Sequence, residues 1–174
     1  KKANNEDLWN RIFRSGPSGI KKQLDKNQFQ GQFRKDYSYA IPTQEVINII
    51  KKFVGNNRVV EVGAGGALWA KLMQDAGISV VPTNINLQKE QDGGYFLPQQ
   101  PFTPVEEMDN MEAMKTYGNY EVLMMIWPPY NNPMASETLK NFKGSKLIYI
   151  GEPYGGATGD NEFFTILNNE WSPA

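Results

Sequence analysis

Short apolar runs alternate along the chain with longer segments in which apolar residues recur at helical spacing. The runs at 59–62, 78–81, 120–127 and 146–150 are mostly apolar, which is typical of strands buried on both faces of a parallel sheet. Residues 102–105 are predicted to form one further, short strand. Because the strands alternate with helices, the pattern predicts an open, mostly parallel α/β sheet with flanking helices and right-handed crossovers.

Helical spacing is clearest at residues 43–54, where Thr43 is a favourable N-cap and Gly55 a favourable terminator. Asp109, followed three residues later by Glu112, gives the capping-box pattern of another helix start. The helices predicted in this way are 4–14, 19–28, 43–54, 68–76, 109–117, 134–142 and one that begins at Asp160.

Three stretches lack a clear period. Residues 86–100 are polar and rich in Gly and Pro, which predicts a loop. For residues 102–105 an alternative interpretation starts a helix at Thr103, with proline at the first helical position. Residues 28–38 mix aromatic residues with Gln and Lys. They can form a lid over a pocket, a strip that binds nucleic acid, or an arm packed on the domain, and we favour the packed arm.

The strand at 59–62 passes directly into a glycine-rich turn, and a helix follows. Gly63 and Gly65 allow a sharp turn and a close approach of a ligand to the backbone. The free N–H groups of the next helix point at the same place, although a turn without a ligand is the alternative. This order is typical of a Rossmann-like domain. The unusual polar and aromatic residues also follow the expected strand ends, at 61–66, 83–86, 108–109, 127–130 and 151–154.

The chain has no cysteine and no histidine among its 174 residues. This excludes disulfides, cysteine-rich zinc sites and catalysis by Ser-His-Asp or Cys-His groups, and we assign no metal site. Any general base must be a carboxylate, Tyr, Lys or the backbone. No signal peptide and no apolar run of membrane-spanning length is visible, so we expect a cytoplasmic protein without membrane contact.

Charge is unevenly distributed. Residues 1–35 carry a net charge of +6 and residues 36–174 a net charge of −7. We therefore expect a basic, helical N-terminal arm at 1–40 and an α/β domain at 41–174. The arm can contact a polyanion or the acidic body of its own domain, and we favour the second because its basic residues are scattered. The sequence does not indicate an oligomeric state.

Over about residues 41–171 this layout resembles the class I S-adenosylmethionine-dependent methyltransferases. The loop Trp127-Pro128-Pro129-Tyr130 looks like the fourth motif of their amino-group enzymes, and a group of small methyltransferase-like proteins shares it. The resemblance implies S-adenosyl-L-methionine as cofactor. It implies a first motif at Glu61, Gly63, Ala64 and Gly65, a ribose contact at Asn84, an adenine contact at Asp109, and a further cofactor contact at Trp127.

The chain departs from that family's pattern at three positions. Ala67 replaces a third glycine, and Asn84 replaces the usual carboxylate. Trp127 stands where Asn or Asp accepts a hydrogen bond from the target amino group, whereas an indole only donates. The residues then expected to act in catalysis are the Pro128 carbonyl and the Glu152 carboxylate as acceptors, Tyr130 as a stacking surface, and Trp127 beside them.

The resulting hypothesis is a methyltransferase that acts on a nitrogen of an unidentified acceptor. The alternative is an inactive methyltransferase-like module that binds a protein or nucleic acid through the arm and the aromatic loop. An NAD-type dehydrogenase is a weaker third interpretation, because the strand at 78–81 lacks a following acidic residue. Nothing after Trp171 can form the antiparallel hairpin that completes the methyltransferase sheet, so either the chain given is truncated or its fold is abbreviated. A nucleic-acid acceptor stays open, although phosphate binding needs clustered Lys and Arg.

Overall fold

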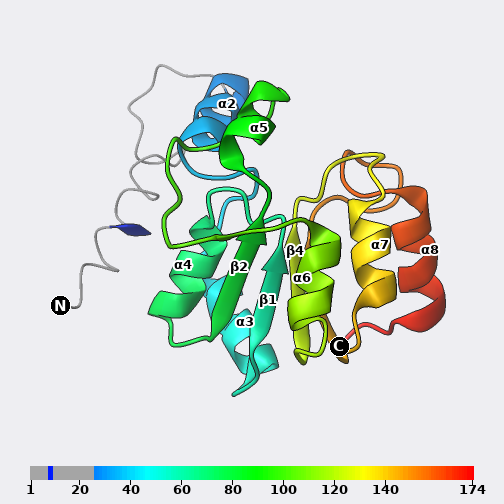
Figure 1. Ribbon diagram of the computed structural model, residues 1–174. Helices are drawn as coiled ribbons and strands as arrows, with labels where there is room; N and C mark the ends of the chain where they lie inside the picture. The colour runs from blue at the N-terminus through cyan, green and yellow to red at the C-terminus, as the bar shows by residue number, and fades with distance from the viewer. Residues whose placement is uncertain (1–7, 10–25) are drawn as a thin grey trace.

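The apolar runs form a five-stranded sheet in which every paired strand runs parallel to its neighbour (Figure 1). This computed structural model describes residues 8–9 and 26–174. Helices flank the sheet, so the fold is α/β and Rossmann-like. In spatial order the strands are β3 (Glu106–Glu107), β2 (Val80–Asn84), β1 (Val59–Val62), β4 (Val122–Ile126) and β5 (Lys146–Ile150).

The direction in which strands are added reverses between β1 and β4. From β1 the chain moves outward through β2 to β3, and it then returns to pair β4 with the other side of β1. In open α/β sheets such a reversal leaves a crevice at the carboxyl ends of the two strands, because the connections after them lie on opposite faces. The topology therefore places a candidate site between the ends of β1 and β4.

Helices cover both faces of the sheet. In Figure 1, α3 and α4 lie on one face and α6, α7 and α8 on the other, while α2 and α5 lie beyond the carboxyl ends of the strands. The described helices are α2 (Lys26–Asp36), α3 (Gln44–Val54), α4 (Leu68–Asp75), α5 (Leu87–Asp92), α6 (Asn110–Tyr117), α7 (Met134–Asn141) and α8 (Asn161–Glu170).

Alternate strand residues belong to two separate apolar clusters. Val59 and Met124 pack with α3 and α4, whereas Val60 and Met125 pack with α6, α7 and α8. This follows from the period of two in a strand, and it explains why β1 and β4 are apolar almost throughout. Glu61 is the exception within β1, and its place two residues after Val59 puts its side chain on the α3 and α4 side.

Several sequence predictions are confirmed residue by residue. Strands form at Val59–Val62 and Lys146–Ile150, as expected. Thr43 caps α3 by accepting a hydrogen bond from the Val46 N–H at 3.2 Å. Asp109 caps α6 in the same way, with the Glu112 N–H at 2.8 Å. These elements depend on local patterns, so the sequence alone is enough to predict them.

Other predictions were wrong. Part of the expected loop at 86–100 is helix α5, capped by Asn86. The stretch at 28–38, where the sequence shows no clear period, is mostly helix α2, in agreement with a helical arm. The third strand lies at Glu106–Glu107 instead of 102–105, and no helix starts at Thr103. Both residues of β3 are exposed, and the strand forms because it pairs with the end of β2, which no local apolar pattern reports.

The structure describes only part of the predicted N-terminal arm, and it describes the whole chain after β5. The predicted helix at 4–14 and most of that at 19–28 fall outside the described residues, so only 8–9, which are helical, and 26–28 can be compared. After β5 the described residues form a loop and α8 and no additional strand, so the sheet ends at β5. Within the described part of the chain, none of the helices combines the length and apolar character needed to cross a bilayer.

The described part of the arm is packed into the core of the domain. Phe33 is only 3% exposed and joins the cluster of α3 and α4.

We expect Phe33→Ala to lower the free energy of unfolding by about 3 kcal/mol or more, because it leaves a ring-sized cavity. Ile49→Ala, at a position on α3 that is 58% exposed, is the matched control and should cost less than about 1 kcal/mol. Urea titration checks both, and equal small losses would show that the arm folds apart from the core.

Candidate functional site

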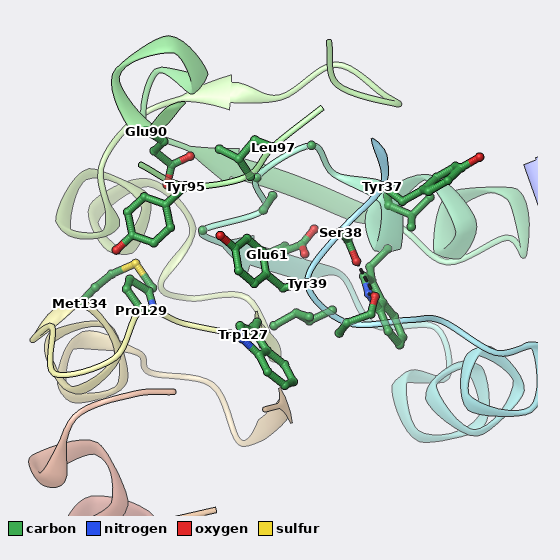
Figure 2. A pocket seen from close by; sticks show the side chains of 18 residues that line it. Tyr37, Ser38, Tyr39, Glu61, Glu90, Tyr95, Leu97, Trp127, Pro129 and Met134 are labelled. Atoms are coloured by element: carbon green, nitrogen blue, oxygen red, sulfur yellow. Dashed lines mark hydrogen bonds between the residues drawn. The ribbon is translucent and has the colours of Figure 1, made fainter. Parts of the chain in front are cut away.

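A cavity of about 90 Å³ lies where the topology places a site, between the ends of β1 and β4 (Figure 2). Its floor is formed by Glu61 and by the glycine-rich turn at 63–66. Trp127 and Pro129, from the loop after β4, form one wall. The other lining residues are Tyr37, Ser38, Tyr39 and Ala40 before α3, Glu90, Tyr95 and Leu97 within and after α5, Leu68 and Trp69 of α4, Ile126 of β4, and Met134 of α7.

The glycine-rich turn has a backbone conformation that its sequence explains. Gly63 and Gly65 have φ angles of +71° and +54°, in the left-handed region that favours glycine. A Cβ at Gly63 would lie 3.3 Å from Met134 Cε, and one at Gly65 would lie 3.1 Å from Leu97 Cδ2. Ala67 has φ +56° as well, so the third expected glycine position keeps a glycine-like backbone with an alanine. The two glycines are therefore needed to form the turn itself.

Glu61 is the unusual group in this cavity. Its side chain is 2% exposed, and Oε2 has no hydrogen-bond partner among the described residues. Burial raises the pKa of Glu61 to about 8. Figure 2 shows the carboxyl group at the centre of the cavity, behind the ring of Tyr39. A buried acceptor without a partner is costly, so this oxygen indicates a place for a ligand that donates a hydrogen bond or carries positive charge.

A second cavity of about 270 Å³ adjoins the first at the end of β2. Asn84 and Ile85, at the end of β2, and Met108 and Asn110, around the start of α6, form its walls. The two cavities share lining residues, so they form one crevice with a narrow part. The shared residues are Gly63, Glu90, Tyr95, Pro129 and Met134.

Asn84 connects the strand end, the glycine turn and helix α5. Its Oδ1 accepts a hydrogen bond from the Gly65 N–H at 3.0 Å, and its Nδ2 donates to Glu90 Oε2 at 2.6 Å and to the Ile85 carbonyl at 2.7 Å. All three polar bonds of this buried side chain are thus made inside the protein. Asn84 lines the second cavity, and its hydrogen bonds position the turn and the Glu90 carboxylate.

Glu90 is a carboxylate that sequence reasoning missed. It lines both cavities, and burial raises its pKa while the hydrogen bond from Asn84 lowers it. Its position brings a carboxylate to the end of β2, where Asn84 itself carries none. Residues 86–100 were predicted to be a loop, so the sequence did not indicate that the Glu90 side chain lies near the end of β2. The Asn86 cap of α5, which accepts from the Gln88 and Lys89 N–H groups, was the local signal available.

The loop after β4 contributes Trp127 and Pro129 to the first cavity, and the other two residues of the motif lie elsewhere. Trp127 has φ +54°, and its N–H donates to the Ile150 carbonyl at 2.6 Å. Pro128 is buried, and its carbonyl accepts the Gly159 N–H at 3.1 Å. Tyr130 is 68% exposed and lines neither cavity.

The Glu152 and Asp109 carboxylates also lie outside both cavities. Glu152 Oε2 accepts the Ala157 N–H, and its own N–H donates to Thr158 Oγ1 at 2.8 Å, so this side chain holds the loop after β5 together. Asp109 is exposed and caps α6. The structure thus brings Glu61, Gly63, Ala64, Gly65 and Trp127 to the first cavity and Asn84 to the second, but it does not bring Pro128, Tyr130, Glu152 or Asp109 to either.

The remaining residues that the sequence did not assign to the site come from the segments above the cavity. Tyr39, Tyr95 and Met134 point into the cavity in Figure 2, and they come from the arm, from the segment after α5 and from α7. A lid over a pocket was one of three interpretations of the aromatic residues in the arm, but it did not predict which residues the lid would contact. The contacts depend on segments far apart in the chain, which a local pattern does not report.

The raised pKa of Glu61 predicts a pH-dependent stability. The folded state keeps its proton up to about pH 8, whereas an unfolded carboxyl titrates near 4.5, so the folded protein should lose stability as the pH rises between these values. The expected loss is at most about 1.4 kcal/mol per pH unit. Urea midpoints measured from pH 5 to pH 8 should fall in the wild type and change less in Glu61→Gln. Glu170→Gln, at the exposed end of α8, is the control, and it should follow the wild type. Parallel curves for all three proteins would contradict the assignment.

The chain has no match among known proteins in any of three comparisons. No protein-family model, no curated protein and no solved structure matches it. The family is therefore not established by comparison, and the function has to be argued from the site.

Proposed function

We propose that the chain binds S-adenosylmethionine in the two adjoining cavities and acts as a methyltransferase on a nitrogen of an acceptor not yet identified. The observation that carries the proposal is the unpartnered Glu61 oxygen beside the glycine turn. S-adenosylmethionine is a cation at its sulfur and carries an ammonium group as well. A carboxyl that lacks a partner in a buried site is a suitable neighbour for such a ligand.

The sizes of the two cavities support the proposal. A water-sized group needs roughly 10–15 Å³ of such cavity volume, so the first cavity has room for roughly six to nine groups and the second for roughly 20. These sizes suit a ligand with a small amino-acid end and a larger nucleoside end. Glu61, Gly63, Ala64 and Gly65 would hold the amino-acid end, and Asn84 and Glu90 would lie beside the nucleoside end.

The charges of the first cavity argue against a pyrophosphate beside the glycine turn, while Lys89 lines the second cavity. Within the described part of the chain, the first cavity has two carboxyl groups, Glu61 and Glu90, and no Lys or Arg side chain in its lining. A pyrophosphate requires positive potential, which this lining does not supply. A ligand with positive charge and aromatic neighbours such as Trp127 and Tyr39 fits better, because cations are attracted to ring faces.

Bound in this site, the cofactor would supply an electrophilic methyl group. The protein residues would exclude water from the crevice and align the acceptor, which is most of what such a transfer needs. Trp127 and Pro129 already wall the first cavity. The Pro128 carbonyl and the Glu152 carboxylate, proposed as acceptors for the target nitrogen, are engaged with Gly159 and Ala157, so a role in transfer would require the loop after β5 to move.

A second candidate function has a specific observation in its favour. Tyr130, Glu152 and Pro128, the three residues expected to handle the acceptor, lie outside the lining of both cavities. Trp127 adds only a hydrogen-bond donor where an acceptor is needed. A module that binds the cofactor or a partner without transferring methyl groups would have this arrangement. The two functions differ in turnover and share cofactor binding.

Calorimetric titration with S-adenosylmethionine and S-adenosylhomocysteine tests the proposal. We expect both to bind the wild type, and affinity should rise with pH by up to tenfold per unit until about pH 8, because Glu61 must lose its proton to face a cation. Glu61→Gln should bind more weakly and with less pH dependence. Glu170→Gln should bind like the wild type. Absence of binding by the folded wild type would overturn the proposal, while binding without methyl transfer to any amine tested would favour the inactive module.

A further inference from the structure

A roof separates the first cavity from solvent, and it is formed by two segments that are distant in the chain. We call residues 37–40 and 95–97 together the roof. Tyr39, from the first segment, and Tyr95 and Leu97, from the second, line the cavity from above. In Figure 2 the ring of Tyr39 stands in front of the Glu61 carboxyl, and the ring of Tyr95 lies beside Met134. A ligand that approaches Glu61 from this side must therefore pass the roof.

Tyr39 and Phe96 form a latch between the two halves of the roof. The Phe96 N–H donates to Tyr39 Oη at 3.0 Å. The Lys35 ammonium lies 5.4 Å from the centre of the Phe96 ring, and the Arg34 guanidinium lies 5.5 Å from that of Tyr39. Phe96 is 46% exposed. The contact of Arg34 lies within the arm, so one neutral hydrogen bond and one cation–π contact join the arm to the second segment. These two contacts are together weak, so this latch can open without unfolding the domain.

The segments beside the latch have further hydrogen bonds to the domain. On one side, Trp69 Nε1 donates to the Ala40 carbonyl at 3.2 Å, and both residues are buried. On the other, Gln91 Nε2 donates to the Leu97 and Pro98 carbonyls, each at 3.3 Å. These bonds hold both halves of the roof close to the sheet and leave the latch between them.

A hinge lies directly before the exposed half of the roof. Gly94 has φ +92°, and a Cβ there would meet no atom within 4 Å. The Tyr95 N–H is bonded to the Glu90 carbonyl at 3.1 Å, so the turn after α5 is held up to that point. Tyr95 is 42% exposed in spite of its size. The part that can swing is therefore short, Tyr95 and Phe96, between the turn held at the Tyr95 N–H and the carbonyls that Gln91 holds.

The roof also contacts the floor of the cavity. Leu97 Cδ2 lies 3.1 Å from where a Cβ of Gly65 would be, and the ring of Pro98 lies still closer to the corresponding position of Gly66. The absence of side chains at these two glycines lets the roof approach the turn. A group that binds at the turn is thus placed directly beneath residues of the roof.

We propose that the roof is a gate, in which the Tyr39–Phe96 latch opens to admit a ligand to the first cavity and closes again over it. The ligand is S-adenosylmethionine if the proposed function holds, since the inference rests on that function for its identity. The second cavity adjoins the first through shared lining residues, so the gate controls the side of the crevice that faces Tyr39 and Tyr95. Opening is a local event, because it breaks contacts of the roof and none of the sheet.

Native-state amide hydrogen exchange tests the gate without any ligand. The Phe96 amide should exchange through a local opening whose rate is insensitive to low urea, whereas β1 amides such as Val60 should follow global unfolding. If the Phe96 amide instead exchanges with the same urea dependence as β1, the roof opens only when the domain unfolds and the gate is overturned. This readout does not depend on what the cavity binds.

Binding kinetics of S-adenosylhomocysteine, followed by the fluorescence of Trp69 and Trp127, provide the second test. Tyr39→Phe keeps the ring and removes the latch acceptor, so association and dissociation rates should both rise about fivefold while Kd changes less than about twofold. Tyr154→Phe, at an exposed tyrosine outside the roof, is the control and should leave both rates unchanged.

The outcomes separate the gate from the proposed function. Unchanged rates in Tyr39→Phe, or a higher Kd with an unchanged association rate, would show that Tyr39 is only a wall of the cavity and would overturn the gate. If the wild type binds no S-adenosylhomocysteine, the proposed function fails. The exchange of the Phe96 amide then decides the gate by itself, with local opening supporting it and global opening overturning it.

Discussion

Complete burial of β1 is the constraint on which the rest of the molecule depends. All four of its residues are buried, because the strand lies at the centre of the sheet with helices on both faces. A carboxyl group placed in such a strand loses most of its hydration, which disfavours the charged form. Burial therefore raises the pKa of Glu61 to about 8. The free energy that this burial costs is tolerated at the end of the strand, where the order of strands reverses and a crevice forms. The strongest electrostatic feature of the chain is thus located by the topology of the sheet.

Asn84 transmits the geometry of the sheet to the site. Its backbone ends β2, and its side chain holds the Gly65 N–H on one side and the Glu90 carboxylate on the other. The amide can do both because it has a donor and an acceptor, whereas a carboxylate at the same position could only accept. The asparagine at this position therefore has a structural reason, and it lies beside a carboxylate supplied from α5.

The two sides of the crevice differ in how rigid they are. The floor is formed by strand ends and a glycine turn that are hydrogen-bonded to neighbouring strands, including the Ala64 N–H to the Thr83 carbonyl at 3.0 Å. The roof is formed by the arm and the segment after α5, which meet through side chains that are partly exposed. A preorganised floor under a weakly latched roof allows a site to be both well ordered and accessible.

The loops after β4 and β5 are joined in a way that the sequence did not suggest. The Gly159 N–H donates to the Pro128 carbonyl, and the Asn131 N–H donates to the Gly159 carbonyl. The Ser136 hydroxyl donates to Asp160 Oδ2 at 2.7 Å, so Asp160 begins α8 while its side chain bonds to α7. Residues that looked free for chemistry in the sequence are in fact occupied in holding the two loops together.

The sequence by itself determined the alternation of strands and helices, the caps at Thr43 and Asp109, and the glycine turn, because each depends on neighbouring residues and on the period of a strand or a helix. Only the tertiary structure decided where β3 lies, since two exposed residues form a strand solely by pairing with β2. It also decided that Glu90 and Tyr39 belong to the cavity, while local hydrogen bonds keep Glu152 outside it. Which side chains share a crevice depends on how segments far apart in the chain pack together, and a local period gives no information about that packing.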